Sequence, residues 1–369
     1  MRVERVEVRE IALDLLTPFE TSFGRTTRRR ILLVRLSADG VEGWGECTAP
    51  EGPFFNEEFA DGAWHLICDF LAPLLLGRDV ASPEEVADLF AHIRGNRMAR
   101  AAVETAVWDL DAKRAGVPLW RHLGGVRPSI ACGVSIGLQP TIEALLERVD
   151  REVRAGYQRI KLKIAPGRDV ALVAAVRERF PRATLSVDAN SAYTLADVDV
   201  LRQLERFHLL MIEQPLRPGD LLDHAKLQSQ FATPICLDES IVDDESARQA
   251  LEIDACRIVN VKLGRVGGHT AARAIATRCA AAGVPVWCGG MLESGVGRLH
   301  NAAMSSLAPY TLPGDVSDSR RYWARDVVEP RPTVDRNGTM LLPDTPGIGA
   351  EVDIGFVETI TVRTRIIEK

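Results

Sequence analysis

Between residues 159 and 290 the chain alternates short apolar segments with longer amphipathic ones. The short segments predict buried strands, and the amphipathic ones predict helices that cover them. The expected strands are 159–164, 183–189, 208–214, 234–240, 256–263 and 284–290, and the expected helices include 169–180, 194–207 and 268–283. Consecutive βα units build a parallel sheet, so we expect the fold class α/β. So many units in a row favour a closed barrel, with an open doubly wound sheet as the alternative.

The regions on either side have a different pattern. Residues 3–13 and 30–38 predict strands, whereas 82–93 and 100–116 predict helices, the second ending at Gly116. Polar and apolar residues alternate again over 356–367, which predicts a strand that rejoins the N-terminal region. We therefore divide the chain into an α+β capping domain (1–125), a β/α barrel (126–322) and a C-terminal segment that returns to the cap (323–369).

Composition excludes several classes of function. With 46% hydrophobic residues, 26% charged residues and a net charge of −6, the 369-residue chain is typical of a globular protein. It offers no electrostatic basis for nucleic acid or an anionic membrane as partner. The most apolar segment, 66–77, is too short to span a bilayer. Seven cysteines without a CxxC pair indicate reduced thiols in a cytoplasmic protein.

Five ionisable residues recur at the ends of the predicted strands. Asp188, Glu213 and Asp238 follow Lys163 at successive intervals of 25 residues, and Lys262 comes 24 residues later. The period matches one βα unit, and the carboxyl ends of barrel strands meet at one mouth. The spacing therefore predicts that all five side chains surround a single site.

The residue types in this series suggest a chemistry. Three carboxylates can share one divalent cation, and a set of oxygen ligands favours Mg²⁺ or Mn²⁺ over zinc. A carboxylate substrate bound to that metal could lose its α-proton to a lysine, and the metal would stabilise the resulting enediolate. We therefore expect Asp188, Glu213 and Asp238 as metal ligands, and Lys163 and Lys262 as catalytic bases.

Lys161 lies two residues before Lys163 on the same face of its strand, about 7 Å away. A solvated strand face would explain this pair by itself, but the matching residues on neighbouring strands favour a site. A like charge lowers the pKa of a lysine, so we expect Lys161 to tune Lys163 and to contact a carboxylate. Asn190 and Glu239 are expected to support the ligands, with helix capping as the alternative.

Several segments together resemble the enolase superfamily, in its muconate-lactonizing-enzyme subgroup. They are 161–164, 187–190, 212–215, 237–240, 261–268 and the helix with its extension at 101–125. The resemblance covers nearly the whole chain and implies a modified TIM barrel, (β/α)7β, with a capping domain. Segment 287–295 contains no histidine. Together with Lys262, this favours the two-lysine branch over the mandelate-racemase branch.

Within that subgroup, segments 17–24, 43–47, 132–137, 285–298 and 312–323 are similar to o-succinylbenzoate synthases and N-succinylamino acid racemases. The resemblance implies that the substrate is bound by Phe19, Phe23, Phe55, Ser135, Arg265, Gly290, Met291, Leu292 and Tyr322. By position alone the apolar members would be ordinary core residues, and Arg265 a surface arginine. The basic run 24–30 could attract a dianionic substrate, although such runs are more often solvated.

The function implied by the resemblance is dehydration of 2-succinyl-6-hydroxy-2,4-cyclohexadiene-1-carboxylate in menaquinone biosynthesis, with racemisation of N-succinylamino acids at the same site. The racemase as the main role is the nearest alternative, and dipeptide epimerase and muconate cycloisomerase are weaker ones. A metal-free barrel with a Schiff-base lysine, or a barrel kept only for binding, would be a different class. The partner is then a small carboxylate anion, and homo-oligomers are common in the family.

Overall fold

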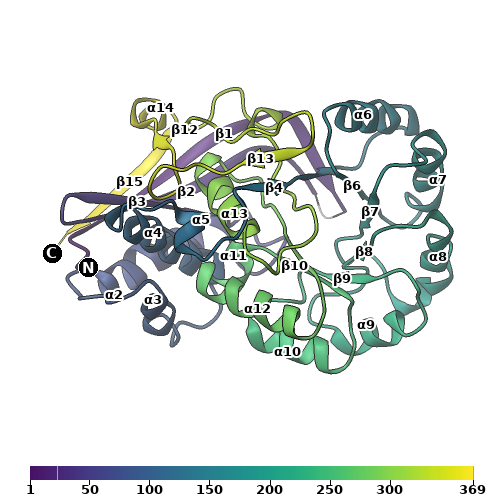
Figure 1. Ribbon diagram of the computed structural model, residues 1–369, viewed down its shortest axis with the longest axis horizontal. Helices are drawn as coiled ribbons and strands as arrows, with labels where there is room; N and C mark the ends of the chain where they lie inside the picture. The colour runs from purple at the N-terminus through teal and green to yellow at the C-terminus, as the bar shows by residue number, and fades with distance from the viewer. Residues whose placement is uncertain (23, 369) are drawn as a thin grey trace.

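The computed structural model describes residues 1–22 and 24–368. The N-terminal part of the chain forms a four-stranded antiparallel sheet together with the last strand. The strand order is β15-β1-β2-β3, so the strand nearest the C-terminus pairs with the first strand of the chain (Figure 1). The strands are β1 (Arg5–Thr21), β2 (Gly24–Ala38), β3 (Val41–Cys47) and β15 (Thr361–Glu368). The two ends of the described chain therefore belong to one capping sheet, as the alternation at both ends predicts.

Helices cover one face of the capping sheet. They are α1 (Ala60–Leu66), a π-helical turn (Ile67–Leu71), α2 (Ala72–Leu75), α3 (Glu84–Leu89) and α4 (Arg97–Arg114). Helix α4 packs closely on β3 because Gly43 and Gly45 carry no side chain there. A Cβ at Gly45 would lie 2.0 Å from the backbone oxygen of Ala102, so no larger residue fits without displacing the helix.

Seven parallel strands form the second sheet, in simple chain order from β5 to β11. They are β5 (Gly133–Ile136), β6 (Arg159–Lys163), β7 (Leu185–Asp188), β8 (Ile212–Glu213), β9 (Ile235–Leu237), β10 (Ile258–Val261) and β11 (Val286–Cys288). All six strands expected between 159 and 290 are present. A doubly wound sheet would reverse its strand order at a switch point, so the sequential order decides for the barrel.

Residues 310–315 complete the ring between β11 and β5. Tyr310 bridges to Val286 of β11, and Gly314 bridges to Cys132 beside β5. The amide of Asp315 also donates to the carbonyl of Cys288 at 2.8 Å. This segment takes the eighth position without forming a regular strand, which agrees with the expected (β/α)7β barrel.

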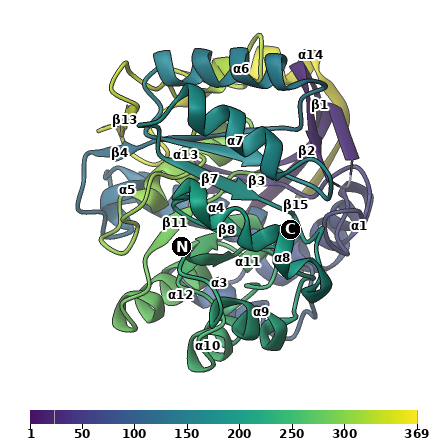
Figure 2. The ribbon, with the colours of Figure 1, turned by 90° about the vertical axis from the view of Figure 1, so that its right-hand side faces the viewer.

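Helices surround the barrel on its outer side (Figure 2). They are α6 (Ile142–Arg154), α7 (Val170–Arg179), α8 (Val198–Arg202), α9 (Leu221–Gln228), α10 (Asp244–Glu252), α12 (His269–Ala281) and α13 (Gly295–Ser305). Short helices α5 (Leu119–His122) and α11 (Leu263–Val266) and 3₁₀ turns at Leu195–Asp197, Glu205–Phe207 and Ser319–Arg321 complete the set. The helix expected over 194–207 is thus a short α-helix between two 3₁₀ turns, so that prediction was wrong in its extent.

The C-terminal region adds two small sheets. Strand β12 (Val328–Glu329) pairs with β14 (Glu351–Val352), and β13 (Thr339–Leu341) pairs with β4 (Ser129–Ala131). The strand expected over 356–367 begins only at Thr361, because Ile354–Thr359 forms helix α14. Domain boundaries at residues 125 and 322 stay our proposed division of the chain.

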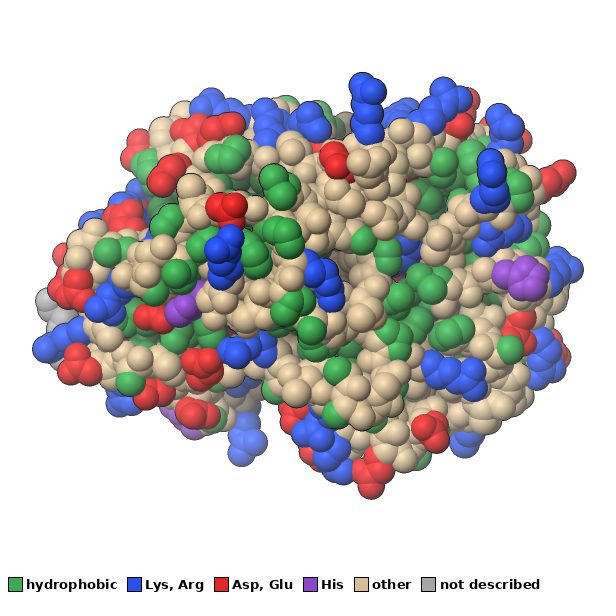
Figure 3. Space-filling model, in the orientation of Figure 1, with side chains coloured by type: hydrophobic (Ala, Val, Ile, Leu, Met, Phe, Trp, Pro, Cys, Tyr) green, Lys and Arg blue, Asp and Glu red, His purple; other side chains and the backbone are tan. Residues whose placement is uncertain are grey.

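The surface and the cysteines agree with the composition. Positive and negative side chains are interspersed over the face shown in Figure 3. The seven cysteines are buried and unpaired. Over residues 1–22 and 24–368, the longest apolar helices fall short of what crossing a membrane requires.

Candidate active site

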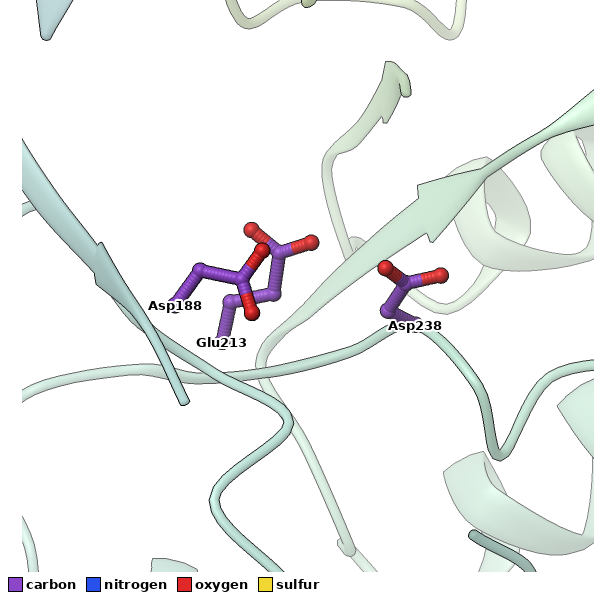
Figure 4. Close-up of side chains that lie close together, drawn as sticks. All are labelled: Asp188, Glu213 and Asp238. Carbon is purple, nitrogen blue, oxygen red and sulfur yellow. The ribbon is translucent and has the colours of Figure 1, made fainter. Parts of the chain in front are cut away.

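Asp188, Glu213 and Asp238 lie together at the mouth of the barrel. Asp188 and Glu213 end the neighbouring strands β7 and β8, and Asp238 follows β9 directly. One carboxylate oxygen from each lies within 4.8 Å of the others, and all three side chains are completely buried. Figure 4 shows the three carboxylates directed toward a common region. We call these three residues the acidic triad.

The two strand-end lysines contact different members of the triad. Lys163 ends β6, in register with Asp188, and its Nζ lies 2.6 Å from Asp188 Oδ2. Lys262 follows β10, and its Nζ lies 2.7 Å from Asp238 Oδ2. Strands β6 and β10 flank the three strands that carry the triad, so the two ammonium groups approach the triad from opposite sides, with Glu213 between them.

Lys161 forms a third cationic contact. Its Nζ lies 3.0 Å from Glu213 Oε2 and 3.1 Å from Asp188 Oδ2, the same oxygen that accepts from Lys163. The alternation in 159–164 is therefore not a solvent-facing pattern, because every residue of β6 is buried. Both partners in the triad are protein carboxylates, and a contact of Lys161 with a substrate carboxylate stays a prediction. Its tuning of Lys163 stays a prediction.

Burial and charge act in opposite directions on these groups. Burial lowers the pKa of Lys161, but Asp315, Glu213 and Asp188 outweigh burial and hold that pKa well above its usual value. The pKa of Lys262 is also raised, because Asp238 and Glu239 outweigh burial. Burial raises the pKa of Glu213 to about 8, and the neighbouring Asp188 adds to the shift. The triad is an environment in which protonation states depend strongly on any added charge.

The donor set of the triad fits a divalent cation. Three carboxylates supply only oxygen atoms, as Mg²⁺ and Mn²⁺ prefer. Their mutual separation of at most 4.8 Å allows one ion to contact all three at about 2.0 to 2.6 Å. Lys161, Lys163, Lys262 and Arg265 already pair with these buried acids, so it is the converging oxygen atoms, and not the burial, that fit a divalent cation.

Four further residues hold the triad and Lys161 in place, and the spacing does not single them out. They are Arg159, Asn260, Trp287 and Asp315. Asn260 Nδ2 donates to Glu213 Oε1 at 2.8 Å. Lys161 Nζ lies 2.7 Å from Asp315 Oδ2 and 4.8 Å from the centre of the Trp287 ring. Arg159 pairs with Asp315 and lies over the same ring. Asn260 could have been found from its position two residues before Lys262 on one strand, whereas Asp315 lies in the irregular segment and gives no periodic signal.

Arg265 is buried behind the triad and not on the surface. Its guanidinium donates to Asp238 and to the backbone oxygens of Ile241 and Asn260. The alternative of a surface arginine is therefore excluded, since the side chain is buried and all three of its nitrogens contact protein atoms. These bonds orient Asp238, and a direct contact of Arg265 with substrate stays a prediction.

Asn190 and Glu239 connect the ends of β7 and β9. Asn190 Oδ1 accepts from Lys163 Nζ at 2.5 Å, and its Nδ2 donates to Glu239 Oε1 at 3.0 Å. The other carboxylate oxygen of Glu239 is buried without a partner among the described residues. Neither side chain makes a helix-capping bond in the described structure. Their support of the metal ligands stays a prediction.

The capping domain reaches the barrel mouth through the β1–β2 hairpin. Leu138, after β5, donates its amide to the carbonyl of Glu20 at 2.9 Å, and Ser22 Oγ donates to the carbonyl of Asn190 at 3.3 Å. Phe19 lines a cavity at this junction together with Ser135 and Tyr322. Phe23 lies outside the described residues.

Phe55 and the segment after β11 lie on the opposite side of the site. The ring centre of Phe55 is 4.9 Å from Lys262 Nζ, so this cap residue contacts a catalytic candidate. Gly290 lies against the carbonyl of Asp315. Met291 packs against the core of the cap and Leu292 against the core of the barrel. Neither Met291 nor Leu292 is among the residues that line the cavity of Ser135 and Tyr322, and their contact with substrate stays a prediction.

A capped (β/α)7β barrel with three acids and two lysines at its mouth has the architecture of an enolase-superfamily enzyme, in which a lysine or histidine base works with Mg²⁺. Two family models match the chain: "Mandelate racemase / muconate lactonizing enzyme, N-terminal domain" over residues 4–124 and "Enolase C-terminal domain-like" over residues 144–355. The chain belongs to the mandelate racemase/muconate lactonizing enzyme family of the enolase superfamily.

Individual relatives are similar over the full length. The chain is 50% identical to an o-succinylbenzoate synthase of Geobacillus stearothermophilus, with 100% of this chain and 98% of the relative covered. It is 48% identical to an N-succinylamino acid racemase of Thermus thermophilus, with 99% of each covered. A crystal structure of an enolase-superfamily member from Listeria innocua superposes with a TM-score of 0.96 at 43% identity, covering 100% of this chain and 99% of that one.

Proposed function

We propose that this enzyme is a Mg²⁺- or Mn²⁺-dependent o-succinylbenzoate synthase that also racemises N-succinylamino acids. The observation that carries the proposal is the pair Lys163 and Lys262, each bonded to a different member of a buried acidic triad. Such a pair can exchange protons with both faces of one α-carbon. The names of the full-length relatives, synthase for some and racemase for others, support the same two reactions.

The residues of the chain have separable roles in this proposal. Asp188, Glu213 and Asp238 would hold the cation, which supplies positive charge beside the substrate carboxylate when bound. One lysine removes the α-proton. In the synthase reaction, hydroxide then leaves the β-carbon. In the racemase reaction, the other lysine returns a proton from the opposite face. Phe55 and the β1–β2 hairpin exclude water from the site.

The test is a pair of assays on the purified protein with and without a chelator. We expect 2-succinyl-6-hydroxy-2,4-cyclohexadiene-1-carboxylate to be converted into o-succinylbenzoate, which ultraviolet absorbance follows, and N-succinylphenylalanine to racemise, which polarimetry follows. Chelation should abolish both activities, and Mg²⁺ or Mn²⁺ should restore them. Higher activity on an L-Ala-Glu dipeptide or on muconate would instead favour epimerase or cycloisomerase chemistry.

The Schiff-base alternative gives an opposite pattern. A lysine that forms an imine with a carbonyl substrate is trapped irreversibly by borohydride and needs no metal. We expect no loss of activity after treatment with borohydride and substrate, and complete loss with EDTA. Mass spectrometry of the treated protein would show an adduct on Lys163 or Lys262 if the imine mechanism were correct.

We also propose a homo-oligomer and a cytoplasmic location. The homo-oligomer is supported by the resemblance, because homo-oligomers are common in the family. The second is supported by the seven unpaired cysteines. Light scattering after size exclusion tests the assembly.

A further inference from the structure

The backbone that follows β11 forms one wall of the Lys262 side chain. Gly289 lies so close to the lysine that a Cβ on this glycine would stand 2.8 Å from Lys262 Cε. A side chain there would displace the lysine, so the backbone itself borders the lysine stem. Elsewhere Lys262 contacts Asp238 and Phe55. The position of the Lys262 ammonium group therefore depends on where residues 289–292 lie.

One residue of this segment adopts a backbone conformation that needs outside support. The φ angle of Leu292 is 58°, in the left-handed region that residues with a side chain rarely occupy. Strained backbone of this kind persists where the surrounding structure holds it in place. The segment therefore needs anchors on both sides of Leu292.

Glu293 supplies these anchors by tying the segment to α13 and to the C-terminal region. Its Oε1 accepts from the backbone amide of Met291 at 2.7 Å and from the side-chain amide of Asn301, on α13, at 2.9 Å. Its backbone oxygen accepts from Arg298 of α13 at 2.9 Å and from Trp323 at 3.1 Å. The two residues that flank the left-handed position are thereby fixed to a helix.

These contacts require an oxygen acceptor at Glu293 and not a negative charge. Glu293 is buried and forms no ion pair with any of the described residues. A Cβ at Gly297 would lie 2.9 Å from Glu293 Cγ and 3.0 Å from Glu46 Cδ, so two carboxylate side chains lie against one glycine. Adjacent carboxylates repel each other, so the charge of Glu293 adds nothing favourable here. A glutamine offers the same acceptor without the charge.

We propose that Glu293 is a positioning residue for Lys262 and acts through the backbone segment that follows β11. The inference rests on the proposed function, in which Lys163 and Lys262 serve opposite faces of the substrate α-carbon. Lys163 is held by other groups, because its ammonium contacts Asp188 and Asn190. A loss at Glu293 should therefore affect only the face that Lys262 serves.

The experiment follows exchange of the α-hydrogen in D₂O for each enantiomer of N-succinylphenylalanine separately, by proton NMR at saturating Mg²⁺. Glu293→Ala removes the acceptor. It should slow, on the order of ten- to hundredfold, the enantiomer whose exchange Lys262→Ala abolishes, because small displacements of a reacting group cost this much. The other enantiomer should exchange at nearly the parental rate. Glu293→Gln keeps the acceptor and should exchange both enantiomers like the parent.

Two further variants keep the test valid if Glu293→Ala does not fold, which circular dichroism decides. Glu293→Asp keeps the charge but shortens the side chain by about 1.5 Å. Asn301→Ala releases Glu293 from α13. Both should slow the same enantiomer as Glu293→Ala. The control is Glu147→Ala, which removes an exposed glutamate from α6 and should slow neither. Equal slowing of both enantiomers, no slowing of either, or equal effects of Glu293→Gln and Glu293→Ala would overturn the proposal.

A crystal structure of Glu293→Ala separates this proposal from the proposed function, because it needs no turnover. Compared with the parent crystallised under the same conditions, residues 289–292 and Lys262 Nζ should be displaced, and Lys163 Nζ should not. If only Lys262 moves, the positioning role stands even if neither reaction is catalysed. If neither lysine moves, or both move, the role is wrong even if both reactions proceed.

Discussion

Lys163 and Lys262 are each bonded to a different carboxylate of the triad, and we propose that each serves a different face of a substrate α-carbon bound between them. We expect Lys163→Ala and Lys262→Ala each to abolish racemisation, because racemisation needs both faces. Each variant should still exchange the α-hydrogen of one enantiomer in D₂O, and the two variants should exchange opposite enantiomers. Positioned acid–base groups contribute about 10² to 10⁴ in rate, so proton NMR will resolve the asymmetry.

Lys226→Ala is a matched control, since Lys226 is an exposed lysine on α9 that pairs with Asp223. It should racemise at the parental rate. Full racemisation by either strand-end variant would show that the two-base assignment is incorrect and that another group transfers the proton.

Asn260 acts on the triad through Glu213, so its effect is expected on metal affinity before catalysis. Both side chains are completely buried, and the amide is the donor to Glu213 Oε1. In Asn260→Ala that oxygen loses its donor and the carboxylate loses its fixed orientation. We expect Mn²⁺ affinity, measured by calorimetry, to fall about 10- to 100-fold. The exposed Asn337→Ala should leave it unchanged. An unchanged affinity in Asn260→Ala would mean that Glu213 is oriented by other groups.

The sequence predicts those residues of the site that lie at the ends of the repeated βα units. Lys163, Asp188, Glu213, Asp238 and Lys262 share one period, and a period is visible without a structure. Asp315 was not predicted because its segment forms no regular strand and carries no repeat.

At the level of elements, Glu46 on β3 joins the capping sheet to the start of α13. Its carboxylate accepts from the amides of Ser294 and Gly297 at 3.0 and 2.9 Å and from the Ser294 hydroxyl at 2.5 Å. Burial raises the pKa of Glu46 to about 7, and these hydrogen bonds offset only part of the shift. The junction between cap and barrel therefore includes an acid that titrates near neutral pH.

This raised pKa makes the junction weaker as the pH rises. Between its ordinary value of 4.5 and about 7, Glu46 retains in the folded state a proton that it has lost in the unfolded state. Stability therefore falls through this range, by roughly 2 kcal/mol from pH 5 to pH 7 for this group. Glu46→Gln should reduce the pH dependence of the free energy of unfolding, measured by urea denaturation, by that amount, and the exposed Glu178→Gln should not. Parallel pH profiles for parent and Glu46→Gln would contradict the shift.

The helix expected over 194–207 shows why some elements were predicted incorrectly. Apolar residues there have helical spacing, and Thr194 and Asp197 form a reciprocal capping box that starts a helix. The first turn, Leu195–Asp197, is nevertheless 3₁₀, and only Val198–Arg202 continues as an α-helix. Apolar spacing and a capping box indicate that a helix begins, but they do not specify its hydrogen-bond type or the residue at which it ends. The buried strands were predicted correctly.

For the whole molecule, cap and barrel share buried contacts far from the mouth. Glu104 of α4 accepts from the amides of His269 and Thr270 at the start of α12, each at 2.8 Å. With Glu46, it gives the cap two buried carboxylates that accept from barrel helices. We therefore expect both parts to unfold in one transition, so that an ion bound at the triad stabilises the entire molecule.

Divalent-ion binding should raise the melting temperature in proportion to the logarithm of ion concentration. At 100 times the Kd, binding to the folded state alone contributes about 2.7 kcal/mol. A chain of this length gains about 1 to 2 °C per kcal/mol, so we expect an increase of roughly 3 to 5 °C with Mg²⁺ or Mn²⁺.

The variant Asp188→Asn should lose most of this increase, because it removes one ligand charge from the triad. Asp199→Asn, which changes an exposed acid on α8, should keep it. An equal increase in Asp188→Asn would place the ion elsewhere. Two separate transitions, with only the later one shifted by the ion, would show that the cap unfolds independently of the barrel despite Glu46 and Glu104.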